Sequence, residues 1–542
     1  MTSDFNRKLI AGRRIRWSDS RAAQAYASGL WVKETLVDSL QRAARETPQR
    51  VLLVDGDRRI DCRTMHMQAT TLAHAMLQRA PAGSVISFML PNWHEAAVVY
   101  LAATLAGMVI NPILPSLREL ELRFILQDAS SRMIFVPQTI GEMDYRAMMD
   151  RVVADMTDAP DVIVVRGDAG DFMSFESLLA SASAVELPHV DADAVRMIMY
   201  TSGTTGRAKG VLHTHNSLHA LINQLREHWL IESGDKFLVP SPIAHIGGSI
   251  YAVECPLLLG TTAVLMERWN AADAVKLVDA EQCTHMVGAT PFLEGMLTAA
   301  RSLGTCLPSL KMFICGGASV PPSLVEDATA YFERAIVTRV YGSTEVPVTT
   351  VGVTQREAAE YAATTDGRAG VADIKLVNHS GARTGEGEIC ARGPQMLVGY
   401  LHEADEADAF DAADYFRTGD IGRWVDDCYL VVSGRAKDTI IRNGENISPK
   451  EIEDILIGHP QIAEIAIVSL PDPRTGERAC AVIVPKNRPG PDVASLRTFL
   501  DARGVATFKA PEQVLITDTL PRNDAGKVLK HQLRAILAAN RS

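Results

Sequence analysis

Three short apolar segments of this chain each end in a loop rich in glycine and hydroxyl residues. Residues 195–200 lead into 200–210, residues 310–315 into 316–319, and residues 336–341 into 342–345. Short apolar runs that alternate with helical stretches are typical of a layered α/β domain, and this alternation fills the first four-fifths of the chain. Ligands of open α/β sheets bind beyond the carboxyl ends of the strands. We therefore expect the three loops to converge on one site.

The first of these loops has the composition of a flexible segment that binds a polyphosphate. It reads Tyr200, Thr201, Ser202, Gly203, Thr204, Thr205, Gly206, Arg207, Ala208, Lys209, Gly210. Glycine lets backbone N–H groups approach an anion, hydroxyl groups add donors, and Lys209 or Arg207 offsets negative charge. It is not a Walker A loop, because Lys209 is followed by glycine rather than by serine or threonine. Taken alone, the segment is also compatible with an ordinary surface loop.

Composition limits the class of protein. With 542 residues, of which 47% are hydrophobic, the chain can bury a large core and is expected to form more than one domain. The 54 Lys and Arg against 65 Asp and Glu give a net charge of -11, which argues against a nucleic-acid partner. The eight cysteines are scattered and form neither a metal motif nor a secreted disulfide framework, so we expect a reducing, cytoplasmic location.

Residues 96–110 carry no charge, but this stretch is shorter than the roughly 20 residues that span a bilayer. We interpret it as a buried helix and expect no transmembrane segment. The basic residues 13–16 are not followed by the apolar region of a signal peptide, and we expect a flexible basic arm there. After the phosphate loop, Asn216 is a candidate N-cap for a helix.

The character of the chain changes near residues 433–435. Beyond this point the pattern predicts a helix at 451–457, strands at 462–468 and 479–484, a helix at 493–500, a strand at 513–517 and a last helix from Lys527. This is a compact α+β domain of about 100 residues. We therefore expect a large domain at 1–434 and a small domain at 435–542, with a hinge between them.

Five motifs, in order along the chain, together resemble the AMP-forming acyl and aryl adenylating superfamily, which includes acyl-CoA synthetases, nonribosomal adenylation domains and firefly luciferase. They are residues 200–210, Tyr341-Gly342-Ser343-Thr344-Glu345, Arg417-Thr418-Gly419-Asp420, Gly434-Arg435-Ala436-Lys437-Asp438, and Pro521-Arg522-Asn523-Asp524-Ala525-Gly526-Lys527. The resemblance covers nearly the whole chain. It implies the adenylating-enzyme fold, a layered α/β large domain with a small mobile α+β domain that swivels at Lys437.

The resemblance implies a two-step reaction with ATP, Mg²⁺ and coenzyme A. An acid attacks the α-phosphorus of ATP and releases pyrophosphate, and the acyl-adenylate then reacts with a thiol. Glu345 suits Mg²⁺, since hard cations bind carboxylate oxygens, and Thr344 can donate to the α-phosphate. Asp420, assisted by Arg435, would accept the ribose hydroxyls, and Lys527 would bridge acid and α-phosphate.

The remaining nucleotide contacts are also implied by the resemblance. Tyr341 would stack on adenine, and the same pocket would include Gly342, Gly316, Gly317 and Ala318. For Tyr341 alone, a role as a core aromatic is the structural alternative. In the thiol-accepting pose, the small domain would present the segment Arg442-Asn443-Gly444 to the site in place of Lys527. This segment would border the pantetheine tunnel. The glycine-rich loop at 200–210, which we call the clamp, departs from the family at Ala208, where proline is usual. We expect this difference to alter the affinity for ATP at most.

The implied acid pocket is lined by residues 242–248 and 288–291 and by residues around Gly316 and Tyr341. His245 corresponds to the gating aromatic, followed by Ile246 and Gly247, with Gly288 opposite. Relatives that activate amino acids have Asp at the position of Ile246, and those that activate dihydroxybenzoate have Asn. The side chain of Ile246 can bind neither an ammonium group nor the hydroxyl groups of dihydroxybenzoate. It therefore favours an apolar acid that is alicyclic, aromatic or of medium chain length. Residues 90–93 and 111–115 resemble bacterial cyclohexanecarboxylate and medium-chain acyl-CoA synthetases.

Coenzyme A is the expected acceptor, because the chain ends at Ser542 without a carrier domain. The alternatives are an aryl-acid enzyme that loads a separate carrier protein, which residues 29–35 also resemble, a noncatalytic nucleotide sensor, and luciferase-type oxygenation. Acetylation of Lys527 by a lysine acetyltransferase would remove its charge and stop adenylation. The sequence leaves the oligomeric state open, a homodimer included.

Overall fold

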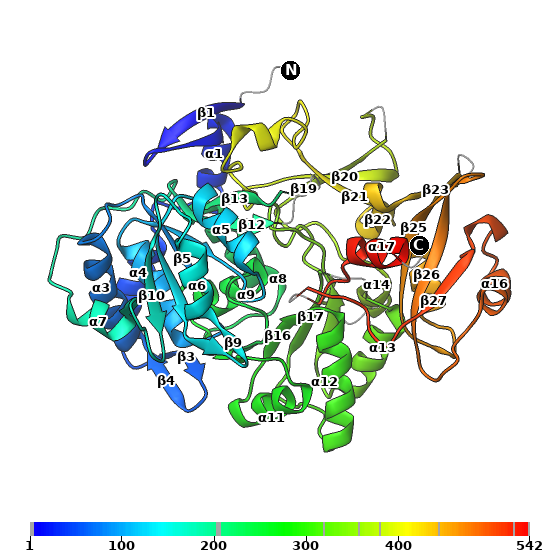
Figure 1. The fold of residues 1–542 in the computed structure, drawn as a ribbon, viewed down its shortest axis with the longest axis horizontal. Helices are drawn as coiled ribbons and strands as arrows, with labels where there is room; N and C mark the ends of the chain where they lie inside the picture. The colour runs from blue at the N-terminus through cyan, green and yellow to red at the C-terminus, as the bar shows by residue number, and fades with distance from the viewer. Residues whose placement is uncertain are drawn as a thin grey trace.

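The computed structural model describes residues 5–201, 207–317, 320–355, 358–378, 381–442, 445–523 and 526–539. The large N-terminal part runs from blue to yellow in Figure 1, and the C-terminal part, from orange to red, lies beside it. Among the described residues, no helix has the length and apolar character needed to cross a bilayer.

Two seven-stranded sheets form the large part of the molecule. The first has the order β11 (Met173–Ser174), β10 (Asp161–Val165), β7 (Ser131–Pro137), β5 (Val85–Phe88), β6 (Val109–Pro112), β12 (Val195–Thr201), β13 (Lys209–Thr214). The second has the order β18 (Ile336–Arg339), β17 (Met312–Cys315), β16 (His285–Gly288), β14 (Lys236–Val239), β15 (Thr262–Leu265), β3 (Val51–Asp55), β4 (Arg58–Asp61). All neighbouring strands are parallel except the edge pairs β12–β13 and β3–β4.

Helices cover both sheets, and α3 (Cys62–Leu77), α4 (His94–Leu105) and α8 (His215–His228) share one apolar core with strands of each sheet. In Figure 1, the green helices α11 (Ala271–Glu281), α12 (Thr290–Leu303) and α13 (Pro322–Tyr331) lie along the second sheet. The other helices among the described residues of this part are α1 (Asp19–Ala27), α2 (Leu36–Glu46), α5 (Glu119–Asp128), α6 (Tyr145–Val153), α7 (Phe175–Ala180), α9 (Ile246–Ser249), the π-helix η1 (Ile250–Glu254), α10 (Cys255–Leu258), α14 (Ala359–Thr364) and the 3₁₀ helix η3 (Glu403–Glu406). The short strands β8 (Thr139–Ile140) and β9 (Met143–Asp144) pair with each other.

The predicted buried helix at 96–110 is confirmed for its first part. Every residue of α4 is buried, because this helix lies within the shared core. The chain then enters β6 at Val109, so the last residues of the apolar stretch belong to a central strand. A continuous apolar run cannot distinguish a buried helix from a buried strand. For this reason the sequence predicted one helix where the structure has a helix followed by a strand.

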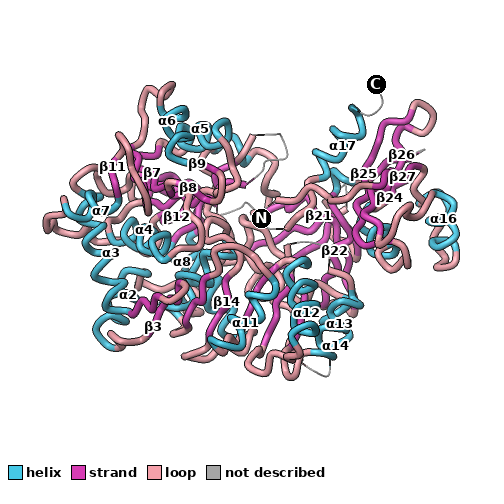
Figure 2. Tube along the Cα trace, turned by 60° about the horizontal axis from the view of Figure 1, so that its bottom comes forward, coloured by secondary structure: helices cyan, strands magenta, loops and turns pink. Residues whose placement is uncertain are grey.

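A third sheet is antiparallel and connects the large part to the C-terminal part. Its order is β19 (Asp373–Val377), β20 (Glu386–Arg392), β21 (Phe416–Val425), β22 (Tyr429–Arg435). Figure 2 shows β21 and β22 between the larger sheets and the C-terminal strands. Asp420 on β21 and Arg435 on β22 are direct cross-strand partners.

The C-terminal part is built on a sheet of β24 (Glu445–Ile447), β23 (Ile440–Arg442), β26 (Gly476–Pro485) and β25 (Ile462–Asp472), with β27 (Gln513–Ile516) paired to β26. Alternate residues of β25 face two different cores. Ile467 packs with α15 (Pro449–Leu456) and α16 (Val493–Asp501), whereas Ala466 and Val468 pack with Leu533 of α17 (Lys530–Ala539). The nearly continuous apolar character of these strands therefore reflects a sheet covered on both faces.

The structure corrects two predicted helix starts, that of the last helix and that of α8. The last helix begins at Lys530 rather than Lys527, because Lys527 lies in a turn closed by the Arg522–Val528 bridge. The N-cap of α8 is Thr214, whose hydroxyl accepts a hydrogen bond from the backbone N–H of Ser217. Asn216 is instead fully buried, and its side chain bonds to Asp193, Tyr26 and the backbone of Val32.

The expected flexible basic arm at residues 13–16 is also wrong. β1 (Phe5–Ile10) and β2 (Arg13–Ser18) form an antiparallel hairpin. Ile15 and Trp17 pack into an apolar cluster on the first sheet, while Arg16 between them pairs with the carboxylates of Glu406 and Asp414. Alternation of apolar and basic residues here marks a strand with two different faces.

An ion pair and a tyrosine hydroxyl form a buried polar cluster inside the large part. Arg196 on β12 bonds to Glu254 at 2.9 Å, and the Tyr100 hydroxyl donates to the same carboxylate at 2.8 Å. The Arg196 and Glu254 side chains are each 1% exposed. Such a pair contributes little net stability while intact, but either charge left alone in the core is costly.

We expect Arg196→Met to lower the midpoint of thermal unfolding strongly, because Glu254 is left unpaired at a cost of about 3–5 kcal/mol. Arg196→Met combined with Glu254→Leu should recover much of this loss, since no charge then remains buried. Calorimetry of the two variants and the parent measures the difference. A double variant less stable than the single one would contradict this account.

Candidate active site

Four of the predicted loops lie at the carboxyl ends of strands of the second sheet. The strands β14, β16, β17 and β18 are neighbours and parallel, so their carboxyl ends face the same way. His245 follows β14, Gly288 ends β16, Gly316 follows β17 and Tyr341 follows β18. The backbone N–H of Gly316 donates to the carbonyl of Gly288 at 3.1 Å. The structure thus brings these four predicted residues together.

The glycines of this edge are needed because other atoms approach their backbone. A Cβ added to Gly288 would lie 2.5 Å from the Phe292 ring, and one added to Gly316 would lie 2.9 Å from the Val340 carbonyl oxygen. At Gly342, a Cβ would lie 2.6 Å from a backbone nitrogen. Gly317 follows Gly316 in the same loop, whereas Ala318 lies outside the described residues.

The residues predicted to border the acid carboxylate form the start of α9. His245 is the N-cap of this helix, and its Nδ1 accepts a hydrogen bond from the backbone N–H of Gly247 at 3.1 Å. Burial lowers the pKa of His245, so its ring is neutral near pH 7. Ile246 is buried and apolar. A polar group of a bound acid would find no hydrogen-bond partner in this side chain.

Asp420 lies at the centre of the part of the site that is predicted to bind the nucleotide. Its two oxygens accept from the Tyr341 hydroxyl at 2.7 Å and from the Arg435 guanidinium at 2.9 Å. Burial and the charge of Asp420 raise the pKa of Tyr341, which therefore remains a donor. Tyr341, predicted as the adenine-stacking aromatic, is thus tied to the carboxylate predicted to hold the ribose.

Thr344 and Glu345 are positioned by two residues outside the recognised motifs. The buried imidazole of His213 donates through Nε2 to the carbonyl oxygen of Thr344 at 2.7 Å, and burial lowers the pKa of His213 to about 4. Glu345 accepts from the Tyr400 hydroxyl at 3.1 Å and from Thr201 at 3.5 Å. Sequence reasoning missed His213 and Tyr400, because a single histidine or tyrosine carries no sequence signal without its contacts.

The donor set around Glu345 fits a hard cation. Among the described residues, the carboxylate of Glu345 faces hydroxyl groups and has no ion-pair partner, so its charge is available to a divalent metal. Magnesium prefers such oxygen ligands and keeps several water molecules. Glu345, together with the phosphates of a bound nucleotide, would hold it.

The described ends of the phosphate clamp form an antiparallel pair, with Thr201 opposite Lys209. Ser202, Gly203, Thr204 and Thr205 lie outside the described residues. Both cations of the clamp contact Asp405. The Arg207 Nη2 atom lies 2.7 and 2.8 Å from its two carboxylate oxygens, and Lys209 donates to its carbonyl oxygen at 3.2 Å.

Lys527 lies near Asp420 and Arg435, although it comes from the C-terminal part of the chain. Burial, and then the charge of Arg435, lower its pKa to about 8, while Asp420 and Asp438 act in the opposite direction. The preceding Gly526 has φ +79°, which favours glycine, and its Cα faces Ala289 and Pro291 of the predicted acid loop. Lys527 is therefore placed between the acid loop and Asp420.

Of the three residues predicted for the thiol-accepting pose, only Arg442 is among the described residues. Asn443 and Gly444 lie outside the described residues, and the Arg442 guanidinium pairs with Glu512 of the C-terminal part at 2.8 Å. Lys437 is exposed in the 3₁₀ helix η4 (Ala436–Asp438). The structure thus presents Lys527, and not Arg442, to the large part.

A cavity of about 210 Å³ lies apart from the predicted site. It is lined by residues of α2 and by His215, His219 and Arg226 on one face of α8. The opposite face of α8, with Leu218, packs in the shared core. None of the predicted acid-binding residues lines this cavity.

The sequence matches two family descriptions in the order of its two parts. Residues 40–401 match "AMP-binding enzyme", and residues 451–527 match "AMP-binding enzyme C-terminal domain". The chain is 31% identical over 534 residues to the medium-chain fatty-acid–CoA ligase of Escherichia coli (strain K12), with 96% of this chain and 93% of the relative covered. It is 30% identical over 536 residues to the 2,3-dihydroxybenzoate-AMP ligase of Bacillus subtilis (strain 168), with 96% and 97% covered.

A solved structure extends the likeness to the fold. The Mycobacterium tuberculosis fatty acyl CoA synthetase superposes with a TM-score of 0.71 at 29% identity, covering 93% of this chain and 99% of that one. The two family matches, the identity to the relatives over nearly the whole chain and this superposition all point to one family. The chain therefore belongs to the AMP-binding enzyme family, within the superfamily of AMP-forming adenylating enzymes.

Proposed function

We propose that the protein is an AMP-forming carboxylic acid–CoA ligase. The observation that carries this proposal is the position of Lys527, beside Asp420 and the acid loop at 289–291. One cation is thereby available to two anions, the carboxylate of the acid and the α-phosphate of ATP. The similarity to fatty-acid–CoA ligases along nearly the whole chain supports coenzyme A as the acceptor.

In the first half-reaction, a carboxylate oxygen of the acid attacks the α-phosphorus, a P–O bond forms, and the bond to pyrophosphate breaks. Asp420 holds the ribose hydroxyls, Thr344 donates to the α-phosphate, and Lys527 offsets the charge that develops between the reactants. Glu345 would hold Mg²⁺, which would neutralise part of the phosphate charge. Each of these groups acts by position and charge, since the reaction needs no covalent bond to the protein.

In the second half-reaction, the thiol sulfur attacks the acyl carbonyl carbon, and the bond to AMP breaks. We propose that the C-terminal part, residues 435–542, first swivels about Lys437 to bring Arg442, Asn443 and Gly444 to the site. Gly434, beside this hinge, has φ +151°, a value that favours glycine. Lys527 and Arg442 belong to the same part of the chain, and one pose presents only one of them.

We propose an apolar acid, whether alicyclic, aromatic or of medium chain length. Ile246 is buried at the start of α9, where relatives that bind polar acids have Asp or Asn, and it offers no partner for an ammonium or hydroxyl group. Pyrophosphate release measured over a panel of such acids identifies the substrate. Preference for amino acids or hydroxybenzoates over their apolar analogues would contradict the assignment.

We expect Lys527→Ala to slow adenylation about 10²- to 10³-fold, because the charge it supplies acts mainly in the transition state. Conversion of a supplied acyl-adenylate and coenzyme A into the thioester should keep the parent rate. Acid-dependent exchange of pyrophosphate into ATP measures the first step, and thioester formation measures the second. Equal losses in both steps would refute the role of Lys527.

The pH dependence of adenylation should have a falling limb near pH 8. Lys527 acts in its protonated form, and its pKa of about 8 means that this form is lost as the pH rises through that value. The limb should be present in kcat/KM and shifted to higher pH in kcat, since bound anions favour the protonated lysine. A profile that stays flat from pH 7 to pH 9.5 would contradict this assignment.

The acceptor can be tested directly, since the similarity to a 2,3-dihydroxybenzoate-AMP ligase favours a second candidate, an enzyme that loads a carrier protein. A labelled acid is offered with coenzyme A or with a phosphopantetheinylated carrier. We expect label in acyl-CoA. Label on the carrier alone would select the second candidate.

Acetylation of Lys527 remains a regulatory proposal, because loss of the charge would stop adenylation. A preparation fully acetylated at Lys527 should lack pyrophosphate exchange and still form thioester from acyl-adenylate. Location in the cytoplasm and association into a homodimer stay predictions from the sequence.

A further inference from the structure

We propose that the N-terminal hairpin β1–β2 is a positioning element for the triphosphate end of the ATP site. It acts through residues 397–406, which we call the strap. This inference rests on the proposed function, because it assigns the hairpin a role in ATP binding. Its evidence is a continuous set of contacts from the arginines of the hairpin to Glu345 and the clamp.

The backbone of the strap lies between the hairpin and the clamp. The N–H of Arg16 donates to the carbonyl of Val398 at 2.7 Å, and the N–H of Val398 donates to Leu212 of β13 at 2.9 Å. Further along, the N–H of Leu401 donates to Gly210 at 2.7 Å. In Figure 1 the blue hairpin lies beside this yellow segment. The strap therefore joins the hairpin to the strand that leaves the clamp.

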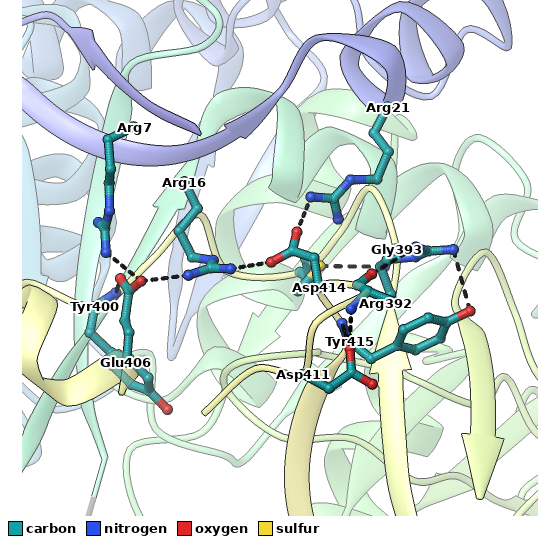
Figure 3. Close-up of polar contacts among 12 residues, drawn as sticks. Arg7, Arg16, Arg21, Arg392, Gly393, Tyr400, Glu406, Asp411, Asp414 and Tyr415 are labelled. Carbon is teal, nitrogen blue, oxygen red and sulfur yellow. Dashed lines mark hydrogen bonds and ion pairs between the residues drawn. The ribbon is translucent and has the colours of Figure 1, made fainter. Parts of the chain in front are cut away.

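A buried carboxylate fixes the strap to the hairpin. Glu406, whose side chain is 4% exposed, accepts from Arg7 at 2.5 Å and from Arg16 at 2.8 Å, as Figure 3 shows. Its other oxygen accepts from the backbone N–H of Tyr400 at 3.0 Å. The Arg16 guanidinium also lies between the Phe5 and Phe410 rings, at 3.8 and 3.6 Å from their centres. Charge, hydrogen bonds and stacking thus hold this end rigidly.

The opposite side of the strap contacts the groups predicted to bind triphosphate and metal. The Tyr400 hydroxyl donates to Glu345, and the N–H of Leu397 donates to the carbonyl of Glu345 at 2.7 Å. Asp405, the residue before Glu406, holds both Arg207 and Lys209. Glu406 and Asp405 are adjacent, so a displacement of the first moves the acceptor of both clamp cations.

The charges of these residues explain why position matters. In the absence of ATP, Asp405 balances Arg207 and Lys209, and a triphosphate must draw these cations away from it. The distance over which they move is set by the strap. If Glu406 is released, the cations and Glu345 lose their common support, and the affinity for ATP should fall. The acid is expected to bind beside Lys527 and the loop at 289–291 rather than beside the strap, so its binding should not change.

Arg7 and Arg21 provide a matched pair of variants. Arg7 pairs with Glu406 and more distantly with Glu403, whereas Arg21 of α1 pairs with Asp414, which Arg16 also holds. Arg7→Gln removes one partner of the strap carboxylate, and Arg21→Gln removes one partner of the neighbouring carboxylate. Both variants leave Arg16 in place, and both lose one partly exposed arginine.

The experiment measures pyrophosphate exchange with ATP and acid varied separately, and thioester formation from supplied acyl-adenylate. We expect Arg7→Gln to raise the KM for ATP about tenfold, the lower end of the range for groups that orient a metal ligand. The KM for the acid and the rate of the second half-reaction should stay at the parent values. Arg21→Gln should change the KM for ATP by less than about twofold, as expected for a partly exposed ion pair. Arg7→Lys, which keeps the charge, should recover part of the loss.

Two outcomes overturn the inference. One is an equal effect of Arg7→Gln and Arg21→Gln on the KM for ATP, and the other is a parallel loss in all three measurements, which would indicate a general structural role. If Arg7→Gln does not fold, Arg7→Lys is compared with Arg21→Lys by the same criteria. A parent enzyme without acid-dependent exchange for any acid would instead contradict the proposed function.

Discussion

The carboxylate of Asp420 links the separate parts of this molecule. It lies on the antiparallel sheet, accepts a hydrogen bond from Tyr341 at the edge of the second large sheet, and pairs with Arg435 at the last residue of β22. Its charge also acts on Lys527 of the C-terminal part. A carboxylate surrounded by a phenol and two cations is strongly held, and three segments distant in sequence are thereby fixed around the position proposed for the ribose and α-phosphate.

A second set of charges organises the phosphate end. Asp405 and Asp128 accept from Arg207 and Tyr200 of the clamp, and Glu406 and Asp414 accept from the arginines at the N-terminus. The net charge of -11 therefore coexists with a concentrated group of cations, because each cation is balanced locally. The phosphates of the proposed ATP would replace part of the negative charge that now balances these cations. The same principle explains why Glu345, which contacts hydroxyl groups, is suited to a metal.

Much of the fold could be predicted from local patterns. The strands at 462–468 and 479–484 were predictable as short apolar runs. The helix at 493–500 was predictable because its apolar residues recur at helical spacing. The start of the last helix was not, since Lys527 belongs to a turn closed by Arg522 and Val528. The hairpin at residues 5–18 was missed for a similar reason. Its basic residues look solvated in sequence, but in the structure their carboxylate partners lie about 390 residues away.

In the candidate site, too, some features could be predicted from the sequence and others could not. The sequence by itself determined the chemical groups, namely the glycine-rich loops, Glu345, Asp420 and Lys527, because their order along the chain carries the family resemblance. Only the tertiary structure decided which of them meet, and it added His213, Tyr400 and Asp405, whose positions follow no spacing rule. The physical reason is that motifs record backbone conformation and local chemistry. The pairing of charges and hydrogen bonds across distant strands exists only after the sheets have packed.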